Sequence, residues 1–474
     1  MIIQFLLQAT LAAAQTPENP FGGYNCPAEC RLPSCKCATR DPPVQDPPQF
    51  ISLQFDDSIQ ASVMPQANGL FANRRNPNGC PAKATWFAQA WYSDPFLATK
   101  WYAEGNEIAD HSVTHTPPST FSYEEFEGFR AWANGLAGIP RGQIKGGRFP
   151  LRNYTVEAFN NLRKMGFEWD ATLAASANER IWPYTMDYGV VTDCGGQMGI
   201  CGKQLDAKGL WEVPMYSVQG GPGGTHLMDV FNDPSISNPM DPEEVTNIYR
   251  STFDSHYANG RVPFGVYLHP VWIGPANPPS IPEGSAKRKA LNDFLDYAMS
   301  RPNVWMVTPS QLIQYMKNPV SASELGSQPY MQCNPNPAPP TNICNGLGNV
   351  GIDSCQLPNG TINTCYGCPS EYPSLQNPTP ARTGNKCPVP DTCDTKWWDP
   401  ATCNCLCSSP SCEWNDLSRP IQPFEEFQKN GSLFDPNNPN SPNNPNKTPS
   451  KSNSEKLLGL FASWIAVFTA IAFI

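Results

Sequence analysis

The sequence is poor in histidine and in charged residues, and no basic block stands out in it. Only 5 of its 474 residues are histidine, charged residues make up 16%, and the formal net charge is -10. Proteins that bind nucleic acid neutralise its phosphates with clustered Lys and Arg, so this composition excludes nucleic acid as a partner. Because histidine is so rare, histidines that occur close together are informative about function.

Cysteine and proline are abundant instead, with 18 and 52 residues respectively. Many unevenly clustered cysteines indicate an oxidising compartment and a disulfide framework, although the sequence does not give their pairing. Four of them, Cys26, Cys30, Cys35 and Cys37, crowd together near the start of the chain. Such spacing also suits zinc, but in a proline-rich segment of a secreted chain we favour disulfides.

Both ends of the chain carry targeting features. Residues 1–14 combine an apolar stretch with small residues at 12–14, which is typical of a secretory signal peptide. The last 18 residues, 457–474, carry no charge and follow a polar spacer, which is the pattern of a GPI-anchor signal. A retained transmembrane helix is the alternative. We expect a secreted protein at the cell surface, attached to the plasma membrane by a GPI anchor or associated with the wall.

The middle of the chain, from Phe50 to about Asn318, alternates predicted strands with predicted helices. Repeated strand–helix units form a parallel sheet with covering helices. Over about 270 residues a distorted or incomplete (β/α) barrel closes such a sheet economically, so we expect an α/β fold of that type. The predicted strands are 50–57, 83–89, 107–110, 143–149, 167–172, 211–215, 264–268 and 304–307, and the predicted helices are 95–104, 122–138, 155–165, 242–257, 286–300 and 310–317.

The segment after this domain has a different composition. Residues 333–412 hold 11 cysteines and are too poor in apolar residues to fold without bridges. Trp397, Trp398 and Trp414 either stack on sugar rings or pack over the disulfides, and the sequence leaves both open. Glycosylation sequons stand at Asn153, Asn359, Asn430 and Asn446. The expected division is a signal peptide at 1–14, a Cys-rich N-terminal segment at 15–45, the main domain at 46–320, a Cys-rich C-terminal region at 321–414, a linker with the anchor attachment region at 415–456, and the tail at 457–474.

Polar residues that can carry chemistry follow several of the predicted strands. Asp56 and Asp57 end the first one, His111 and His115 follow another, and His269 follows a late one. The two acids alone would also suit a turn that caps the next helix. Parallel strands, however, bring residues at their carboxyl ends to one rim, where α/β enzymes keep their chemistry. The other two histidines, His226 and His256, have no comparable setting, and we interpret them as ordinary residues.

These residue types predict metal-assisted hydrolysis of an acyl group. Two imidazoles and one carboxylate, from His111, His115 and Asp57, form a three-ligand site with open positions, which acidifies water for attack. The second carboxylate, Asp56, then serves as the base, and His269 protonates the leaving group. Two further residues lie at predicted strand ends: Arg148 is expected to hold the Asp56 carboxylate in place, and Asp170 is expected to orient His269.

Five ordered motifs resemble those of the NodB-like polysaccharide deacetylases, carbohydrate esterase family four. They are Gln54–Asp57, His111–His115, Arg148–Pro150, Trp169-Asp170 and Leu268-His269. Further stretches resemble the insect-type chitin deacetylases, namely Leu32–Cys37, Asn76–Cys80, Trp182–Met186, Trp211-Glu212 and Cys365–Pro373, so that the resemblance covers roughly residues 26–380.

The resemblance implies a distorted (β/α) barrel that removes acetyl groups from N-acetylglucosamine units of chitin. It implies Asp56 as base, His269 as acid, Arg148 and Asp170 as their supports, and Zn2+ or another divalent metal such as Co2+ or Mn2+ on Asp57, His111 and His115. Backbone N–H groups after Asp56 and beyond Pro150 are the expected oxyanion donors. The chain departs from the family where Leu151 follows Pro150, in place of an aromatic residue, and where Thr172-Leu173 replace a frequent Trp.

Three functions are compatible with these observations. The leading hypothesis is a monomeric cell-surface chitin deacetylase. The second is a wall-associated protein that grips chitin but turns over poorly, which the altered third motif and the Cys-rich flanks motivate. The third is a deacetylase or esterase for another polymer, such as acetyl xylan or peptidoglycan, because loops between the motifs set specificity. Acetate release and a comparison of substrates distinguish the three.

Overall fold

The computed structural model describes residues 24–116, 123–192, 205–220, 224–232, 236–237, 240–274, 283–333, 352–384, 386–387, 398–399 and 403–405. The expected signal peptide, linker and C-terminal tail lie outside these residues, as do Trp397 and Trp414. Within the described ranges, none of the helices has both the length and the apolar character needed to cross a membrane.

The main domain is built on a sheet whose central strand is β1, Gln49–Asp56, with all eight residues buried. Three neighbours pair with it in parallel: β12 (Phe264–Leu268) along one side, and β13 (Val304–Met306) and β2 (Thr85–Ala88) along the other, where β13 pairs with the start of β1 and β2 with its end. The sheet continues outwards through β3 (Glu107–Asp110), β4 (Gly146–Gly147), β5 (Trp169–Asp170), β8 (Trp211–Glu212) and β7 (Tyr184–Thr185).

The sheet is parallel up to β8, and β7 pairs with β8 antiparallel. The strand order has two ends, at β7 and at β12, so the sheet is a curled, incomplete barrel as the sequence predicted. A separate parallel pair is formed by β6 (Ala174–Ala175) and β9 (Met215–Tyr216). It lies beside β12, where the hydroxyl of Tyr267 accepts a hydrogen bond from the Tyr216 N–H at 2.9 Å.

Three predicted strands are shorter than expected, and local reasons account for two of them. The strand predicted at 167–172 reduces to Trp169–Asp170. The strand predicted at 143–149 reduces to Gly146–Gly147, preceded by a 3-10 turn at Arg141–Gln143. Glycine is required there, because a Cβ on Gly146 would lie 2.0 Å from the Trp169 ring. The strand predicted at 211–215 is divided into β8 and β9, with Pro214, which lacks a backbone N–H, between them.

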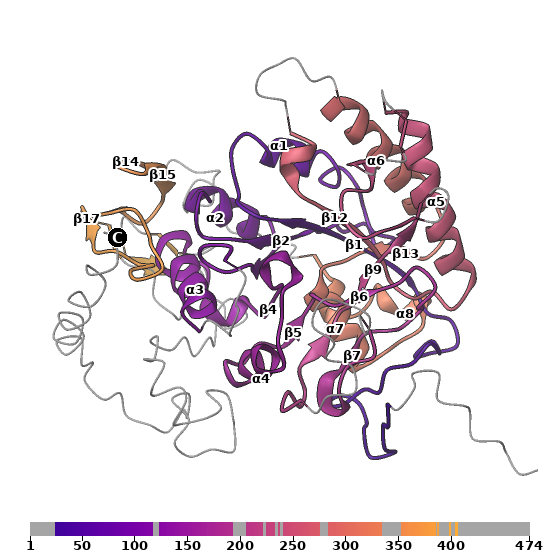
Figure 1. Ribbon diagram of the computed structural model, residues 1–474. Helices are drawn as coiled ribbons and strands as arrows, with labels where there is room; N and C mark the ends of the chain where they lie inside the picture. Colours follow the sequence, from indigo (N-terminus) through magenta and orange to yellow (C-terminus); the bar gives the residue numbers. More distant parts are fainter. Residues whose placement is uncertain are drawn as a thin grey trace, which may run out of the picture.

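Helices follow most strands and cover the sheet, and their positions agree with the prediction. Figure 1 shows α5 and α6 side by side at the right of the view, with α2 and α3 next to each other at the left, where both contact β3. Phe55 packs against Trp86 and Trp101 in one core, and Phe87 packs against Trp169 in the other. The helices are α1 Met64–Asn68, α2 Pro95–Ala103, α3 Tyr123–Ala137, α4 Val156–Lys164, α5 Pro242–Ala258, α6 Glu283–Met299, α7 Pro309–Lys317 and α8 Ala322–Leu325.

Disulfides hold both flanks, as the cysteine pattern predicted. The N-terminal cluster forms Cys26–Cys37 and Cys30–Cys35, so its four thiols are paired with one another. Cys80–Cys333 ties the end of the main domain back to its start. Cys355–Cys368 and Cys387–Cys403 lie in the C-terminal region. In the described part of the chain no cysteine is free.

The C-terminal Cys-rich region packs on the main domain, and its described residues contain three antiparallel strand pairs, the longest of which is β14 (Asp353–Leu357) with β15 (Gly360–Thr364). The orange segment of Figure 1 lies beside α2 and α3. Asn363 donates through its backbone N and Nδ2 to Asp94 Oδ2, at 3.1 and 2.7 Å, and Thr364 Oγ1 donates to Leu136 O at 2.8 Å. The remaining short strands are β10 Val218–Gln219, β11 Thr225–His226, β16 Cys368–Pro369, β17 Arg382–Thr383, β18 Trp398–Asp399 and β19 Asn404–Cys405.

Candidate active site

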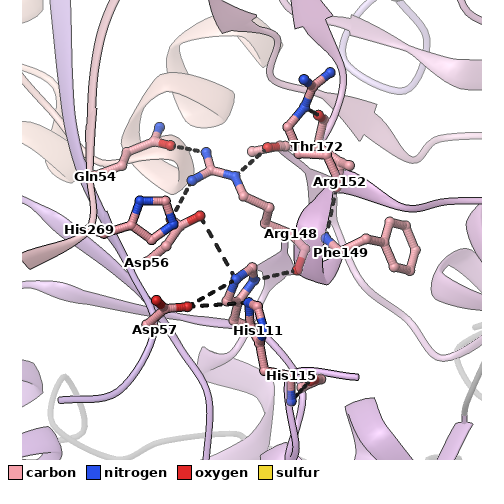
Figure 2. A network of polar contacts seen from close by, with 12 residues as sticks. Gln54, Asp56, Asp57, His111, His115, Arg148, Phe149, Arg152, Thr172 and His269 are labelled. Atoms are coloured by element: carbon pink, nitrogen blue, oxygen red, sulfur yellow. Dashed lines mark hydrogen bonds and ion pairs between the residues drawn. The ribbon is translucent and has the colours of Figure 1, made fainter. Parts of the chain in front are cut away.

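The carboxyl ends of the parallel strands bring the predicted site residues to one rim. Asp56 ends β1, His111 follows β3, Arg148 follows β4 and His269 follows β12. The strand register places these residues at similar heights along the sheet, because Phe55 pairs with Leu268, and Asp110 pairs with Gly147. Figure 2 shows these side chains pointing toward one another from separate strands. The sequence prediction that they share a rim is therefore confirmed.

Asp57, His111 and His115 form a group that can hold a metal ion. One ligand atom from each lies within 4.8 Å of the others. Asp57 Oδ1 lies 3.3 Å from His115 Nε2 and 3.9 Å from His111 Nε2, and within the described part of the chain this buried oxygen has no hydrogen-bond partner. Asp57 adopts a left-handed conformation, with φ 77°, where the backbone turns after β1. This turn directs both adjacent carboxylates to the site, although they follow one strand.

The donor set of this group fits a divalent cation. His111 Nδ1 lies 2.8 Å from the backbone oxygen of Arg148, so Nδ1 carries the proton and Nε2 offers its lone pair to the site. Burial lowers the pKa of His111 to about 4, which keeps the ring neutral, as a ligand must be. A neutral imidazole and an orphaned carboxylate oxygen that face each other are the arrangement a bound cation would satisfy.

Arg148 holds the Asp56 carboxylate, as predicted. Its Nη1 lies 2.5 Å from Asp56 Oδ1, and both side chains are almost fully buried. The same guanidinium donates through Nη2 to Gln54 Oε1 and through Nε to Ala171 O at 2.8 Å. The Arg148 side chain also stacks over the Phe87 ring, with its central carbon 4.0 Å from the ring centre. Asp56 therefore keeps one oxygen fixed and turns the other, Oδ2, toward His111 Nε2 at 3.9 Å.

The carboxylate that orients His269 is Asp229, and the prediction that Asp170 does so is wrong. Asp229 Oδ2 hydrogen-bonds His269 Nδ1, and Asp229 Oδ1 accepts the His269 backbone N–H at 2.9 Å. Asp229 reaches this place because its own N–H donates to Tyr267 O at 3.1 Å and its φ is 48°. Burial lowers the pKa of His269, but the Asp229 hydrogen bond and the charges of the nearby aspartates outweigh it and raise that pKa to about 9.

Asp170 supports the third motif instead. It is fully buried, and its two oxygens accept from Thr172 N at 2.8 Å and Thr172 Oγ1 at 2.9 Å. Thr172 Oγ1 in turn accepts from Phe149 N at 2.9 Å, and Thr172 O accepts from Arg152 Nε at 3.0 Å. Burial raises the pKa of Asp170 to about 7. Asp170 thus acts through Thr172 on the backbone next to Arg148, and does not contact the reacting groups through the hydrogen bonds described.

The segment after Pro150 has an unusual backbone. Leu151 and Arg152 both have positive φ, 54° and 53°, and the Leu151 side chain is 63% exposed. The Leu151 side chain therefore projects into solvent. Sequence reasoning identified the departure from the family pattern but gave no geometry for it.

His256 has a structural role, as expected from its position outside the motifs. The ring is buried, and its Nδ1 lies 3.1 Å from the backbone oxygens of both Val262 and Pro263. Burial lowers its pKa to about 4. The residues that sequence reasoning missed are Gln54, Asp229 and Thr172. Gln54 stands inside the first motif, whereas nothing in the sequence around Asp229 indicates a role.

The chain has relatives of known name. It is 30% identical over 379 residues to Chitin deacetylase 1 of Bombyx mori, covering 74% of this chain and 68% of that protein. It is 28% identical over 392 residues to Chitin deacetylase 8 of Bombyx mori, covering 78% and 96%. Among solved structures, a family 4 carbohydrate esterase from Streptomyces lividans in complex with acetate aligns over 55% of this chain and 94% of that chain, with 15% identity and a TM-score of 0.30. No protein-family model matches the chain.

Proposed function

The chain belongs to the NodB-like polysaccharide deacetylase family, and from this premise we propose that it hydrolyses the N-acetyl groups of chitin at the cell surface. The observation that supports the chemistry is the convergence of three groups on one rim. These groups are a ligand set for a divalent cation, a carboxylate held by an arginine, and an imidazole held by a second carboxylate. Together they supply what hydrolysis of an amide requires: activated water, a base and an acid.

Asp57, His111 and His115 would hold the metal, for which we propose Zn2+ ahead of Co2+ or Mn2+. When bound, a divalent cation in such a site polarises the acetyl carbonyl and acidifies water. His111 contributes a neutral ring whose orientation is fixed by the backbone oxygen of Arg148. Asp57 contributes the oxygen that lies between the two imidazoles.

Asp56 is the proposed base, since its Oδ1 is held by Arg148 while Oδ2 faces the site. It would accept the proton of the attacking water. His269, protonated at neutral pH because its pKa is about 9, would give its Nε2 proton to the leaving amine, while Asp229 holds Nδ1. The products are acetate and a glucosamine unit. Backbone N–H groups at Asp57 and beyond Pro150 are the proposed oxyanion donors.

We further propose a secreted, glycosylated monomer carrying a GPI anchor. The disulfide pairs on both flanks support an oxidising compartment. Asn359 lies in an exposed turn between β14 and β15, where a glycan can be accommodated. Asn153, half-buried beside the third motif, offers less room.

The test is acetate release from a chitin oligosaccharide by the full chain. It is run with added Zn2+, with a chelator, and with the Asp56→Asn variant, which preserves shape but cannot act as a base. We expect release that requires metal and is lost in Asp56→Asn. A matched control is Asp241→Asn, which replaces an exposed helix-capping residue of α5 by an equally good cap and should leave release unchanged.

Two other results would change the assignment. Release from acetyl xylan or peptidoglycan fragments but not from chitin would keep the chemistry and replace the substrate. No release from any of the three polymers, by a folded protein that binds metal and chitin, would indicate a wall-associated binding protein. In that case the backbone at Leu151 and Arg152, which departs from the family pattern, is the first place to examine.

A further inference from the structure

Side chains hold the backbone N–H groups of the turn that carries both histidine ligands. All four successive backbone N–H groups from Ser112 to His115 donate to side-chain oxygens. Ser112 N donates to Asp110 Oδ1 at 2.8 Å, and His115 N donates to Ser112 Oγ at 2.9 Å. The two central N–H groups, of Val113 and Thr114, both donate to Glu125 Oε2, each at 2.8 Å. The backbone holds the other side of the turn, because the oxygens of Ser112 and Val113 accept from Ala90 N and Trp91 N, at 3.1 and 2.9 Å. Side chains therefore satisfy the donors of this turn, and the neighbouring segment satisfies two of its acceptors.

Glu125 reaches the turn from another element. It lies in the first turn of α3 and its residue is only 4% exposed. Besides the two N–H groups, its other oxygen, Oε1, accepts from the Thr114 hydroxyl. A buried carboxylate needs such donors, because burial without hydrogen bonds costs several kcal/mol. Glu125 thus ties both central residues of the turn to the helix.

The turn needs this support because its conformation is unfavourable for its residues. Ser112 and His115 have positive φ, 72° and 61°, which costs about 1 kcal/mol or more for each residue other than glycine. Neither position has a glycine to relieve the strain. Yet His115 must keep this conformation, because it places Nε2 3.3 Å from Asp57 Oδ1 (Figure 2).

We propose that Glu125 is a positioning residue that sets the metal affinity of the site by holding the His111–His115 turn closed. It is not one of the three ligand residues, and it acts on them through the backbone of Val113 and Thr114. This inference rests on the metal-binding role given to Asp57, His111 and His115 in the proposed function. Residues that orient metal ligands typically change metal affinity by about 10- to 100-fold when removed.

The experiment measures Zn2+ affinity of the metal-stripped full chain by competition with a chromophoric chelator. Glu125→Ala removes all three acceptor contacts, and we expect the Zn2+ dissociation constant to rise by at least about tenfold. Glu125→Gln keeps one oxygen for the two N–H groups, and the Thr114 hydroxyl can reverse to accept from the new amide. We therefore expect Glu125→Gln to stay within about threefold of the wild type. Because no substrate is present, the result does not depend on which polymer is the substrate.

Glu124→Ala is the matched control, since Glu124 neighbours Glu125 on α3 but is exposed, and it should leave Zn2+ affinity unchanged. Thermal unfolding of the metal-free proteins separates positioning from folding: we expect the stabilisation by added Zn2+ to shrink in Glu125→Ala. At saturating Zn2+ its kcat should return toward the wild-type value, because all three ligands remain.

The inference is overturned if Glu125→Ala binds Zn2+ as tightly as the wild type. It is equally overturned if Glu125→Gln is as weak as Glu125→Ala, since hydrogen-bond acceptance would then not be the cause. Should Glu125→Ala fail to fold, Glu125→Asp applies the same test, because its carboxylate is withdrawn by one methylene. It should weaken Zn2+ binding by at least about threefold, and unchanged binding would overturn the inference.

Discussion

Replacing Asp229 by Asn tests the most consequential contact that the structure adds to the sequence. Asp229 gives His269 a charged partner on Nδ1 and also accepts its backbone N–H. Asn keeps the size of the side chain and an oxygen for one hydrogen bond, but it removes the negative charge. The charge matters because His269 must be protonated to donate to the leaving amine. Activity is therefore present below the pKa of His269 and is lost as the pH rises through it.

The magnitude follows from the causes of the His269 pKa, which is about 9 against an ordinary value of 6.5. Burial lowers this pKa, and the contacts with Asp229 lead the effects that raise it. A bound cation would offset the charge of Asp57 and so lower the pKa of His269. The wild-type pH–activity profile should therefore fall on its alkaline side, the alkaline limb, with a midpoint at or below about pH 9. If Asp229→Asn brings the pKa to about 7, the protonated fraction at pH 8 falls from about nine-tenths to about one-tenth. We therefore expect about a ninefold loss at pH 8 and a much smaller loss at pH 6.

The assay is kcat/KM for acetate release from a chitin oligosaccharide between pH 6 and 10, with saturating Zn2+. An NMR titration of the His269 ring gives the same pKa without catalysis. Asp241→Asn, the exposed helix cap used above, is the control and should reproduce the wild-type profile. Asp170→Asn should lower activity but leave the alkaline limb in place, because the described hydrogen bonds of Asp170 reach Thr172 and none of them reaches His269.

The reasoning would be refuted by an alkaline limb that stays in place in Asp229→Asn. It would also be refuted if Asp170→Asn moved the limb and Asp229→Asn did not, because the sequence-based assignment of the orienting carboxylate would then have been right. A uniform loss in Asp229→Asn with an unchanged His269 titration would mean that Asp229 shapes the loop but does not set the charge of the imidazole.

Three further changes have expected outcomes. In Arg148→Lys the planar guanidinium that holds the Asp56 carboxylate is replaced by a single ammonium group. We expect kcat to fall by about 100-fold, while Zn2+ affinity, measured by chelator competition, stays within a few-fold of the wild type. Gly146→Ala would place a Cβ 2.0 Å from the Trp169 ring, so thermal unfolding should show a loss of about 1–3 kcal/mol, and an unchanged Tm would contradict this packing. Asp94→Ala removes the cap of α2 and the acceptor of both Asn363 bonds, so we expect a loss of about 2 kcal/mol and faster proteolysis within residues 352–384; Asp94→Asn, which preserves a cap, should lose less.

The sequence was sufficient for the central chemistry because that chemistry lies at the ends of regular elements. Asp56, His111, Arg148 and His269 each follow a predicted strand, and parallel pairing brings such positions to one rim whatever the loops do. The prediction that Arg148 holds Asp56 is confirmed by the 2.5 Å contact. The central strands were predictable because they are short apolar runs, and the structure buries them along their whole length.

Asp229 could not be found in this way. It precedes His269 by 40 residues and stands in a loop, where no periodicity fixes the direction of a side chain. Its position depends on a backbone hydrogen bond to Tyr267 and on a positive φ, both of which exist only in the folded chain. Asp170 does lie at a strand end, so its place was predicted correctly, but its partner was not. A strand end fixes the level of a residue and leaves open which neighbour its side chain contacts.

The C-terminal Cys-rich region shows the same limit at a larger scale. Its composition indicated a disulfide-held segment, which the Cys355–Cys368 bridge confirms. Composition could not show that Asn363 and Thr364 bind Asp94 and Leu136 on the helices next to the site. Such contacts join one side chain to a backbone or carboxylate hundreds of residues away, and no local pattern records them.

Arg148 connects the two halves of the site through different atoms. Its guanidinium holds Asp56, the proposed base, while its backbone oxygen holds the Nδ1 of His111, a proposed metal ligand. A substitution changes the first contact and leaves the second, because every residue has a backbone oxygen. Thr172 and Asp170 fix the strand end that presents Arg148, and metal binding depends on the backbone at this strand end. The base, Asp56, depends on the Arg148 side chain. It follows that substitutions of Asp170 or Thr172 should impair both halves together, whereas substitutions of the Arg148 side chain should separate them.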